Sequence, residues 1–176
     1  MDYCFPIPTV SNELPAMTNL PAYPDFTVTL SGDLWRQAEF VNISKLKTVG
    51  AEVDEIKEIH INHSRELAEG IRAFGQVHIR KAIGAPELFI PLFELRSFLN
   101  SDPLGAIAID DHPGFVKNGF AITSRGGCYY GTEENGIIKS LALCDPNPRA
   151  AYEVPRIVRY FSLVFVDWCE CIIQTP

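Results

Sequence analysis

The chain has 176 residues, of which 47% are hydrophobic and 21% charged, so its composition is that of a globular protein rather than a disordered one. Its formal net charge of −7 disfavours a nucleic-acid-binding surface, which needs clustered Lys and Arg, and suits an acidic surface for a basic protein partner. The N-terminus carries no charged-then-apolar leader, and no apolar run approaches the ~20 residues of a membrane span, so we expect neither a signal peptide nor a membrane segment.

The five cysteines do not follow a disulfide pattern, because their number is odd and no two are spaced as C-x-x-C. We therefore expect reduced thiols and a cytoplasmic location. Cys169 and Cys171 are the closest pair. A metal site there would need at least two more ligands from elsewhere, and buried reduced thiols are the favoured interpretation.

The first 24 residues contain five prolines, which disfavour regular helix and predict an extended arm that follows the surface. Residues 25–176 are then expected to form a single globular domain. Residues 26–30 alternate and are rich in β-formers, so they predict a first strand. Residues 34–43 suit either a second strand or a short helix, and strand is preferred.

Two helices are expected in the next stretch of the chain. Val53, Ile56 and Ile59 recur at helical spacing with Glu and Lys between them, which predicts the first helix. Residues 58–62 also alternate, so strand is an open alternative at that end.

The second of these helices is predicted to begin at Ser64, which reads as an N-cap followed by an acidic first turn. Leu67, Ile71 and Phe74 would line its buried face, and Gly75 would end it.

Residues 76–81 alternate and predict a short strand, and residues 84–86 announce a further element. A helix over residues 92–99 is predicted next. Pro86 and Pro91 both suit its first turn, and the polar run after it would end it.

A β-meander is predicted over residues 105–143. Its four strands are expected at residues 105–109, 120–123, 128–130 and 137–143. Gly126 and Gly127 can adopt positive φ, so the chain can reverse there and pair the second strand with the third.

In residues 156–171 the polar side chains recur at helical spacing within an otherwise apolar segment, which predicts a largely buried helix. The Val and Ile content leaves a central strand as the alternative. Taken together, these elements predict a single α+β domain whose mostly antiparallel sheet packs against two or three helices.

Residues 119–130, GFAITSRGGCYY, resemble the strand-turn-strand repeat of some bacterial pleckstrin-homology-like domains. The resemblance covers only this hairpin, and hairpin chemistry alone also produces such a pattern. It implies no function for this chain.

Two groups of residues could carry chemistry. His60 and His63 would share a helix face and could provide two metal ligands, although no zinc signature accompanies them. Asp110, Asp111 and His112 follow a predicted strand and could form a carboxylate–imidazole pair for acid–base catalysis. The favoured interpretation of the two histidines is that they are exposed at the end of a helix or strand. The favoured interpretation of Asp110, Asp111 and His112 is a simple turn.

No motif identifies a reaction or a cofactor, so a non-catalytic protein-binding protein is expected, such as a bacterial immunity or antitoxin-type inhibitor that covers a basic partner. The expected contacts are Asp110, Asp111, Glu133 and Glu134. The alternative is a small hydrolase or metal-dependent enzyme that uses the histidine or aspartate groups above. A structural or oligomer-forming role is also compatible with the apolar C-terminal segment.

Overall fold

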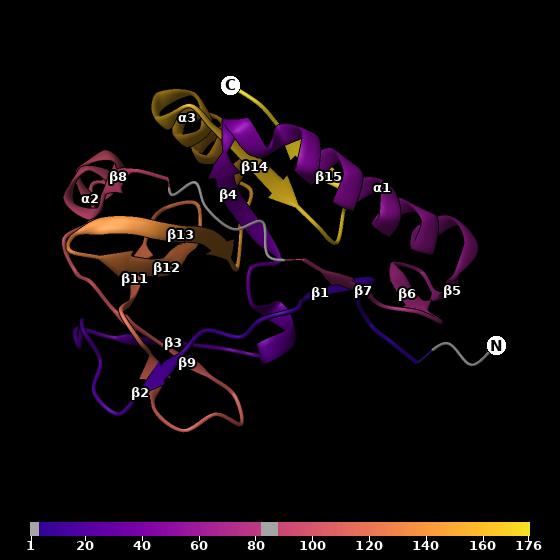
Figure 1. The fold of residues 1–176 in the computed structure, drawn as a ribbon, viewed down its shortest axis with the longest axis horizontal. Coiled ribbons are helices and arrows are strands. Elements are labelled where there is room, and N and C mark those ends of the chain that lie inside the picture. The colour runs from indigo at the N-terminus through magenta and orange to yellow at the C-terminus, as the bar shows by residue number, and fades with distance from the viewer. Residues whose placement is uncertain (1–3, 82–87) are drawn as a thin grey trace.

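The computed structural model describes residues 4–81 and 88–176 (Figure 1). Within them, a seven-stranded antiparallel sheet forms the centre of an α+β fold, which confirms the predicted fold class. Its strands, in spatial order, are β11 (Gly119–Thr123), β12 (Cys128–Glu134), β13 (Ile137–Cys144), β4 (Ala38–Asn42), β14 (Leu163–Asp167) and β15 (Ile172–Gln174). The seventh, β8 (Ile90–Pro91), pairs with the start of β13.

The described residues also form four two-stranded pairs beside this sheet. Two are parallel, β1 (Thr9–Ser11) with β7 (His78–Arg80) and β3 (Thr27–Leu30) with β9 (Ala106–Ile109). Two are antiparallel, β2 (Met17–Thr18) with β10 (Phe115–Val116) and β5 (Ser64–Ala68) with β6 (Ile71–Phe74). The helices are α1 (Leu46–Asn62), α2 (Leu92–Leu99) and α3 (Ala150–Phe161), with short 3₁₀ turns at Gly32–Leu34 and Ile43–Lys45. In the described part, no helix is long and apolar enough to span a membrane.

The two faces of the central sheet are covered by different elements. Phe40 of β4 and Leu163 of β14 belong to one core cluster, together with the apolar residues of α2 and α3. Val41 and Val164, one position further along the same strands, belong to another cluster with α1. Because strand side chains alternate between faces, α1 lies on the face opposite to α2 and α3, as Figure 1 shows. The β3–β9 pair packs on the α1 side, over β11 to β13.

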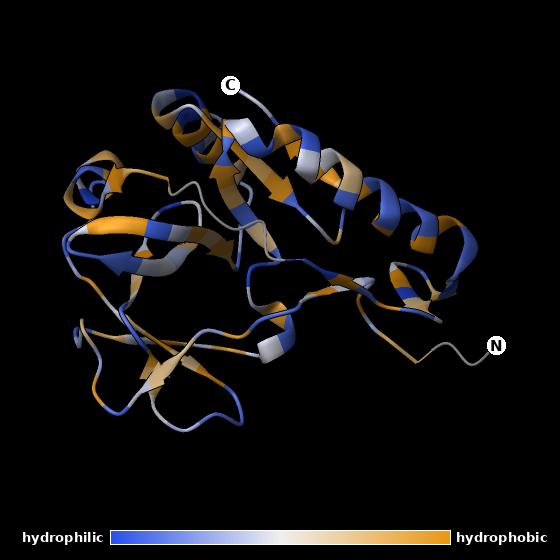
Figure 2. Ribbon diagram, in the orientation of Figure 1, coloured by the Kyte–Doolittle hydropathy of each residue, from blue (hydrophilic) through white to orange (hydrophobic). Residues whose placement is uncertain are grey.

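The predicted helix through Val53, Ile56 and Ile59 is confirmed as α1, and strand is excluded for residues 58–62. These three residues and Val49 are buried, so the helical period in the sequence marks the face that packs on the sheet. In Figure 2 α1 alternates between hydrophilic and hydrophobic residues, whereas β14 is largely hydrophobic, as a central strand buried on both faces should be.

The helix predicted from Ser64 is wrong, because this stretch forms the β5–β6 hairpin. The Ser64 hydroxyl donates to a carbonyl oxygen in the last turn of α1, so it closes that helix rather than opening another. Gly70 takes a φ of 75° at the hairpin turn, a value that favours glycine. Leu67 and Ile71 are exposed, and of the three predicted core residues only Phe74 is buried.

The predicted meander is confirmed for its last three strands, β11, β12 and β13. Its first strand is the exception, because β9 pairs in parallel with β3, and an isolated bridge from Gly105 to Ala121 links the start of β9 to β11. A Cβ on Gly105 would come within 2.5 Å of the Phe26 ring, so glycine allows the chain to enter β9 against the start of β3.

For residues 156–171 the sequence predicts either a helix or a central strand, and they contain the end of one helix and one strand. Helix α3 ends at Phe161, and the next residue, Ser162, has a φ of 53° that turns the chain directly into β14. The strands predicted near residues 26–30, 34–43 and 76–81 appear as β3, β4 and β7, and α2 occupies the predicted residues 92–99. The element predicted at residues 84–86, with Pro86, lies outside the described residues.

The N-terminal arm is extended and joins the fold through β1 and β2; its separation from residues 25–176 as a domain of its own stays a prediction. The buried Arg80 guanidinium secures it by donating to Thr9 Oγ1 at 3.1 Å, to Gln37 Oε1 at 3.0 Å and to a backbone carbonyl of the same loop. It also lies 5.2 Å from the centre of the Trp168 ring, whose Nε1 donates to the buried Glu39. Burial lowers the pKa of Arg80 to about 10.

Candidate functional site

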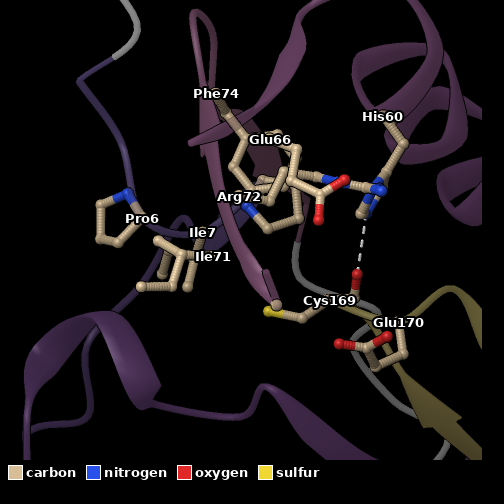
Figure 3. Close-up of a pocket in the computed structure, with 11 residues that line it drawn as sticks. Pro6, Ile7, His60, Glu66, Ile71, Arg72, Phe74, Cys169 and Glu170 are labelled. Atoms are coloured by element: carbon tan, nitrogen blue, oxygen red, sulfur yellow. Dashed lines mark hydrogen bonds between the residues drawn. The ribbon is translucent and has the colours of Figure 1, made fainter. Parts of the chain in front are cut away.

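The site with the most varied chemistry is a cavity of about 370 Å³ where the N-terminal arm, the β5–β6 hairpin, the end of α1 and the loop after β14 meet (Figure 3). The cavity is lined by Pro6, Ile7, Pro8, His60, Glu66, Gly70, Ile71, Arg72, Phe74, Cys169 and Glu170.

His60 is held in place at both of its ring nitrogens. Arg72 has only hydrogen-bond donors, so its contact at 3.3 Å makes Nδ1 of His60 the acceptor. Nε2 therefore carries the proton and donates it to the backbone carbonyl of Cys169 at 2.8 Å. The edge of Phe74 packs on the imidazole, with the ring centres 5.1 Å apart. With both nitrogens occupied, His60 is a structural clamp in this arrangement rather than a free base.

His60 contacts the backbone of Cys169, but the Cys169 thiol does not form a hydrogen bond with the imidazole. Figure 3 shows the sulfur pointing away from the imidazole, and the thiol donates instead to Gln37 Oε1 at 3.4 Å. Burial, followed by the charge of Asp167, raises the pKa of Cys169 to about 11. A thiol with that pKa is protonated at neutral pH, so this arrangement does not provide a Cys–His nucleophile.

Two carboxylates of the cavity form no ion pair or side-chain hydrogen bond with any described residue, Glu66 of the hairpin and Glu170 of the C-terminal loop. Arg72 faces Glu66 in the β5–β6 register but directs its guanidinium to His60. Asp167, whose carboxylate accepts from the backbone N–H of Glu170, adds a further negative charge nearby. Burial and then the Glu170 charge raise the pKa of Asp167 above its ordinary 3.8. Among the described residues, the cavity lining therefore has two carboxylates, Glu66 and Glu170, and one guanidinium, Arg72.

Exposed apolar side chains occur in the cavity lining and at chain or bridge neighbours of lining residues. Ile71 lines it and is 58% exposed, and its hairpin neighbour Leu67 is 59% exposed. Ile61, which follows His60 in α1, is 74% exposed, and Phe5, bridged to Phe74, is 40% exposed.

The predicted pair of His60 and His63 does not share a helix face, because α1 ends at Asn62 and His63 leaves the helix. The Nδ1 atom of His63 is buried without a partner among the described residues. Within residues 4–81 and 88–176, no group of three or more His, Cys, Asp or Glu side chains is arranged to hold a metal ion.

Asp110, Asp111 and His112 form an exposed turn after β9. Asp111 has a φ of 63°, and the His112 Nδ1 atom contacts the backbone oxygen of Asp110 at 3.1 Å. The imidazole is therefore engaged with the main chain rather than with either carboxylate, which is the geometry of a turn.

Glu133 and Glu134 lie at the far end of the β12–β13 hairpin. Glu133 accepts from the backbone N–H of Gly136 at 2.6 Å and from the Tyr23 hydroxyl at 3.3 Å. Glu134 lies 3.5 Å from Lys139, and both glutamates line a second cavity of about 500 Å³. Of the four acidic residues predicted as partner contacts, two thus lie in the turn after β9 and two at the end of β12.

The sequence alone did not indicate Glu66, Arg72 and Glu170 as a group. Glu66 and Arg72 lie in the stretch assigned to a helix, and Glu170 is distant from them in the chain. Only the hairpin register, which sets Glu66 opposite Arg72, could have indicated the first two. No family model, curated protein or solved structure matches this chain.

Proposed function

We propose that this protein is a non-catalytic protein-binding protein whose acidic surface receives a basic segment of its partner. The observation that carries the proposal is that Glu66 and Glu170, two carboxylates without a described partner, line the same cavity as the exposed Ile71. The net charge of −7 would also attract a basic partner over longer distances.

The cavity suits the side chain of a partner lysine or arginine. Its apolar wall of Pro6, Ile7 and Ile71 can cover the aliphatic stem, and the two carboxylates can pair with the cationic head. Apolar residues flanking that lysine or arginine can cover Ile71 and the exposed Leu67 of the same hairpin. Burial of one anchoring side chain in a pocket, with apolar contact around it, is a common way for protein interfaces to gain most of their affinity.

The clamp at His60 and the protonated Cys169 thiol support binding over catalysis at this cavity. All five cysteines lie in the described part and are free thiols, which supports a reducing, cytoplasmic compartment. Immunity and antitoxin-type inhibitors, which cover basic surfaces of toxins, are the class that we favour.

A peptide-display selection tests this proposal without knowledge of the partner. Random peptides are selected on the natural protein and, in parallel, on a Glu66→Gln, Glu170→Gln double variant. We expect Lys or Arg flanked by apolar residues to be enriched on the natural protein only, with affinity about ten-fold lower for the double variant.

An Asp110→Asn, Asp111→Asn variant is the matched control, because it removes the same amount of charge from the exposed turn. Loss of binding in this control alone would move the contact surface to the turn predicted from the sequence. Enrichment of acidic peptides, or no enrichment on any of the three proteins, would contradict the proposed function.

A further inference from the structure

A separate cavity of about 480 Å³ lies between the C-terminal end of α2, the β11–β12 turn and α3. It shares no residue with the acidic cavity at His60. Its polar lining is rich in hydrogen-bond donors, and it is lined by Phe98, Leu99, Asn100, Ser101, Thr123, Ser124, Arg125, Glu153 and Arg156.

The Arg156 guanidinium is held in position by an aromatic ring, and its N–H groups form no hydrogen bond with a described residue. Its guanidinium carbon lies 5.2 Å from the centre of the Phe98 ring, close enough for a cation–π interaction. Phe98 is itself held by Tyr160 and Phe161, at ring-centre distances of 5.0 Å and 5.6 Å. The N–H groups of Arg156 have no acceptor among the described residues, so the whole donor fork is available to a ligand.

Arg125 reaches the same cavity from the β11–β12 turn. Its backbone is fixed, because its carbonyl accepts from Asn147 Nδ2 at 2.8 Å and the turn is closed by the hydrogen bond from Ser124 N–H to the Gly127 carbonyl at 2.8 Å. Its guanidinium has no partner among the described residues. Arg125 therefore adds a second guanidinium without a described partner to the residues that line the cavity.

Glu153 is the one acidic residue of the lining, and its charge is largely compensated. Its Oε2 atom accepts from the Ser124 hydroxyl at 2.6 Å, from the Tyr129 hydroxyl at 3.0 Å and from the Gly126 N–H at 3.1 Å. Three donors on one carboxylate oxygen disperse its charge and hold it against the wall. The lining has a net charge of +1, from two arginines and one glutamate, in a protein whose overall charge is −7.

We propose that this cavity binds the phosphate group of a small phosphomonoester through Arg125 and Arg156. Two guanidinium forks from separate elements match the several oxygens of a doubly charged phosphate better than a single carboxylate. Neither the Ser101 hydroxyl nor the Asn100 side chain has a hydrogen-bond partner among the described residues, so both can add donors. Phe98 and Leu99 offer an apolar wall to the rest of the ligand. A cavity of this volume holds a ligand of metabolite size.

Calorimetric titration with phenyl phosphate, inorganic phosphate and phenol tests this site. We expect phenyl phosphate to bind more tightly than inorganic phosphate, and phenol not to bind. Equal affinity for the two phosphates would retain the anion site and identify free phosphate as its ligand. No binding of either phosphate would overturn the proposal.

Variants distinguish the site from general attraction to surface arginines. Arg125→Gln and Arg156→Gln should each weaken phenyl phosphate binding about ten-fold, because each removes charge-assisted hydrogen bonds. Arg159→Gln is the matched control, since this exposed arginine of α3 does not line the cavity, and it should change the affinity less than two-fold. Thermal melts check folding, and Arg156→Lys, which keeps the charge but loses the fork, should also weaken binding. Equal effects of Arg156→Gln and Arg159→Gln would overturn the assignment. Because the acidic cavity takes no part, failure here leaves the proposed protein binding unaffected.

Discussion

The imidazole Nε2 of His60 donates its proton to the backbone carbonyl of Cys169 at 2.8 Å, which ties the end of α1 to the loop after β14. Arg72 occupies the other ring nitrogen, so three segments that are distant in the chain are fixed by one side chain. This clamp keeps Glu66 and Glu170 at the same cavity, and the proposed binding site depends on it.

The β5–β6 hairpin predicts opposite outcomes for two substitutions that a helix would make equivalent. Ile71→Asp should leave the melting temperature within about 2 °C, because Ile71 is 58% exposed. Phe74→Asp should open the hairpin, because it would bury an unpaired charge where Phe74 is now 3% exposed. Amide hydrogen exchange over residues 64–74, measured with the melts, reports both effects. Severe destabilisation by Ile71→Asp would contradict the hairpin and restore the helix.

The Cys169 thiol should be nearly inert to alkylation at neutral pH. With a pKa of about 11, about one thiol in a thousand is ionised at pH 8, and the exposed Cys4 should react first. Mass spectrometry after iodoacetamide treatment measures the two rates. The Cys169 rate should rise about ten-fold per pH unit until the pH nears 11. Rapid modification of Cys169 at pH 7 would instead indicate an activated thiol and favour an enzyme.

Ionisation of Asp167 should lower the free energy of unfolding as the pH rises. Its folded-state pKa is raised above 3.8, mainly by burial, so the folded protein binds this proton more tightly than the unfolded chain does. The stabilising contribution is complete below pH 3.8 and is lost as the pH rises through the folded-state pKa. Asp167→Asn removes the charge, and the Asn side-chain oxygen can still accept from the Glu170 N–H. The melting temperature of the variant, relative to the natural protein, should therefore be higher at pH 7 than at pH 3. A difference that does not change with pH would refute this.

Arg80 should be one of the most sensitive positions of the polar interior. Arg80→Ala leaves Thr9 and Gln37 without their buried donor, and we expect a loss of about 3 kcal/mol in the free energy of unfolding. Arg80→Lys should recover only part of this, because one ammonium group cannot reach all of the acceptors. Urea unfolding measures both. A loss below about 1 kcal/mol for Arg80→Ala would show that the arm is held by other contacts.

The elements that could be predicted from the sequence are those whose signal is local. The period of Val53, Ile56 and Ile59 located α1, and Gly126 and Gly127 located the β11–β12 turn. The spacing of apolar residues in residues 64–74 also matches a helix, and the hairpin is distinguished by the pairing of β5 with β6 and by the positive φ of Gly70 at the turn.

The parallel pairing of β9 with β3, and the cavity at His60, could not be predicted in the same way. Each joins residues far apart in the chain, and a single sequence contains no local pattern for such contacts. The acidic residues that it did single out, Asp110, Asp111, Glu133 and Glu134, stand in runs that are easily seen. Glu66 and Glu170 stand alone in the sequence and meet only in the fold.

The most direct test of the proposed binding is an NMR titration of the ¹⁵N-labelled protein with a peptide from the display selection. We expect the largest shifts at the backbone amides of Glu66, Ile71, Arg72 and Glu170 and at the His60 ring. These shifts should be absent when Glu66→Gln, Glu170→Gln protein is titrated under the same conditions. Shifts confined to the turn at Asp110 and Asp111 or to the hairpin end at Glu133, with none at the cavity, would contradict the assignment of the binding site to Glu66 and Glu170.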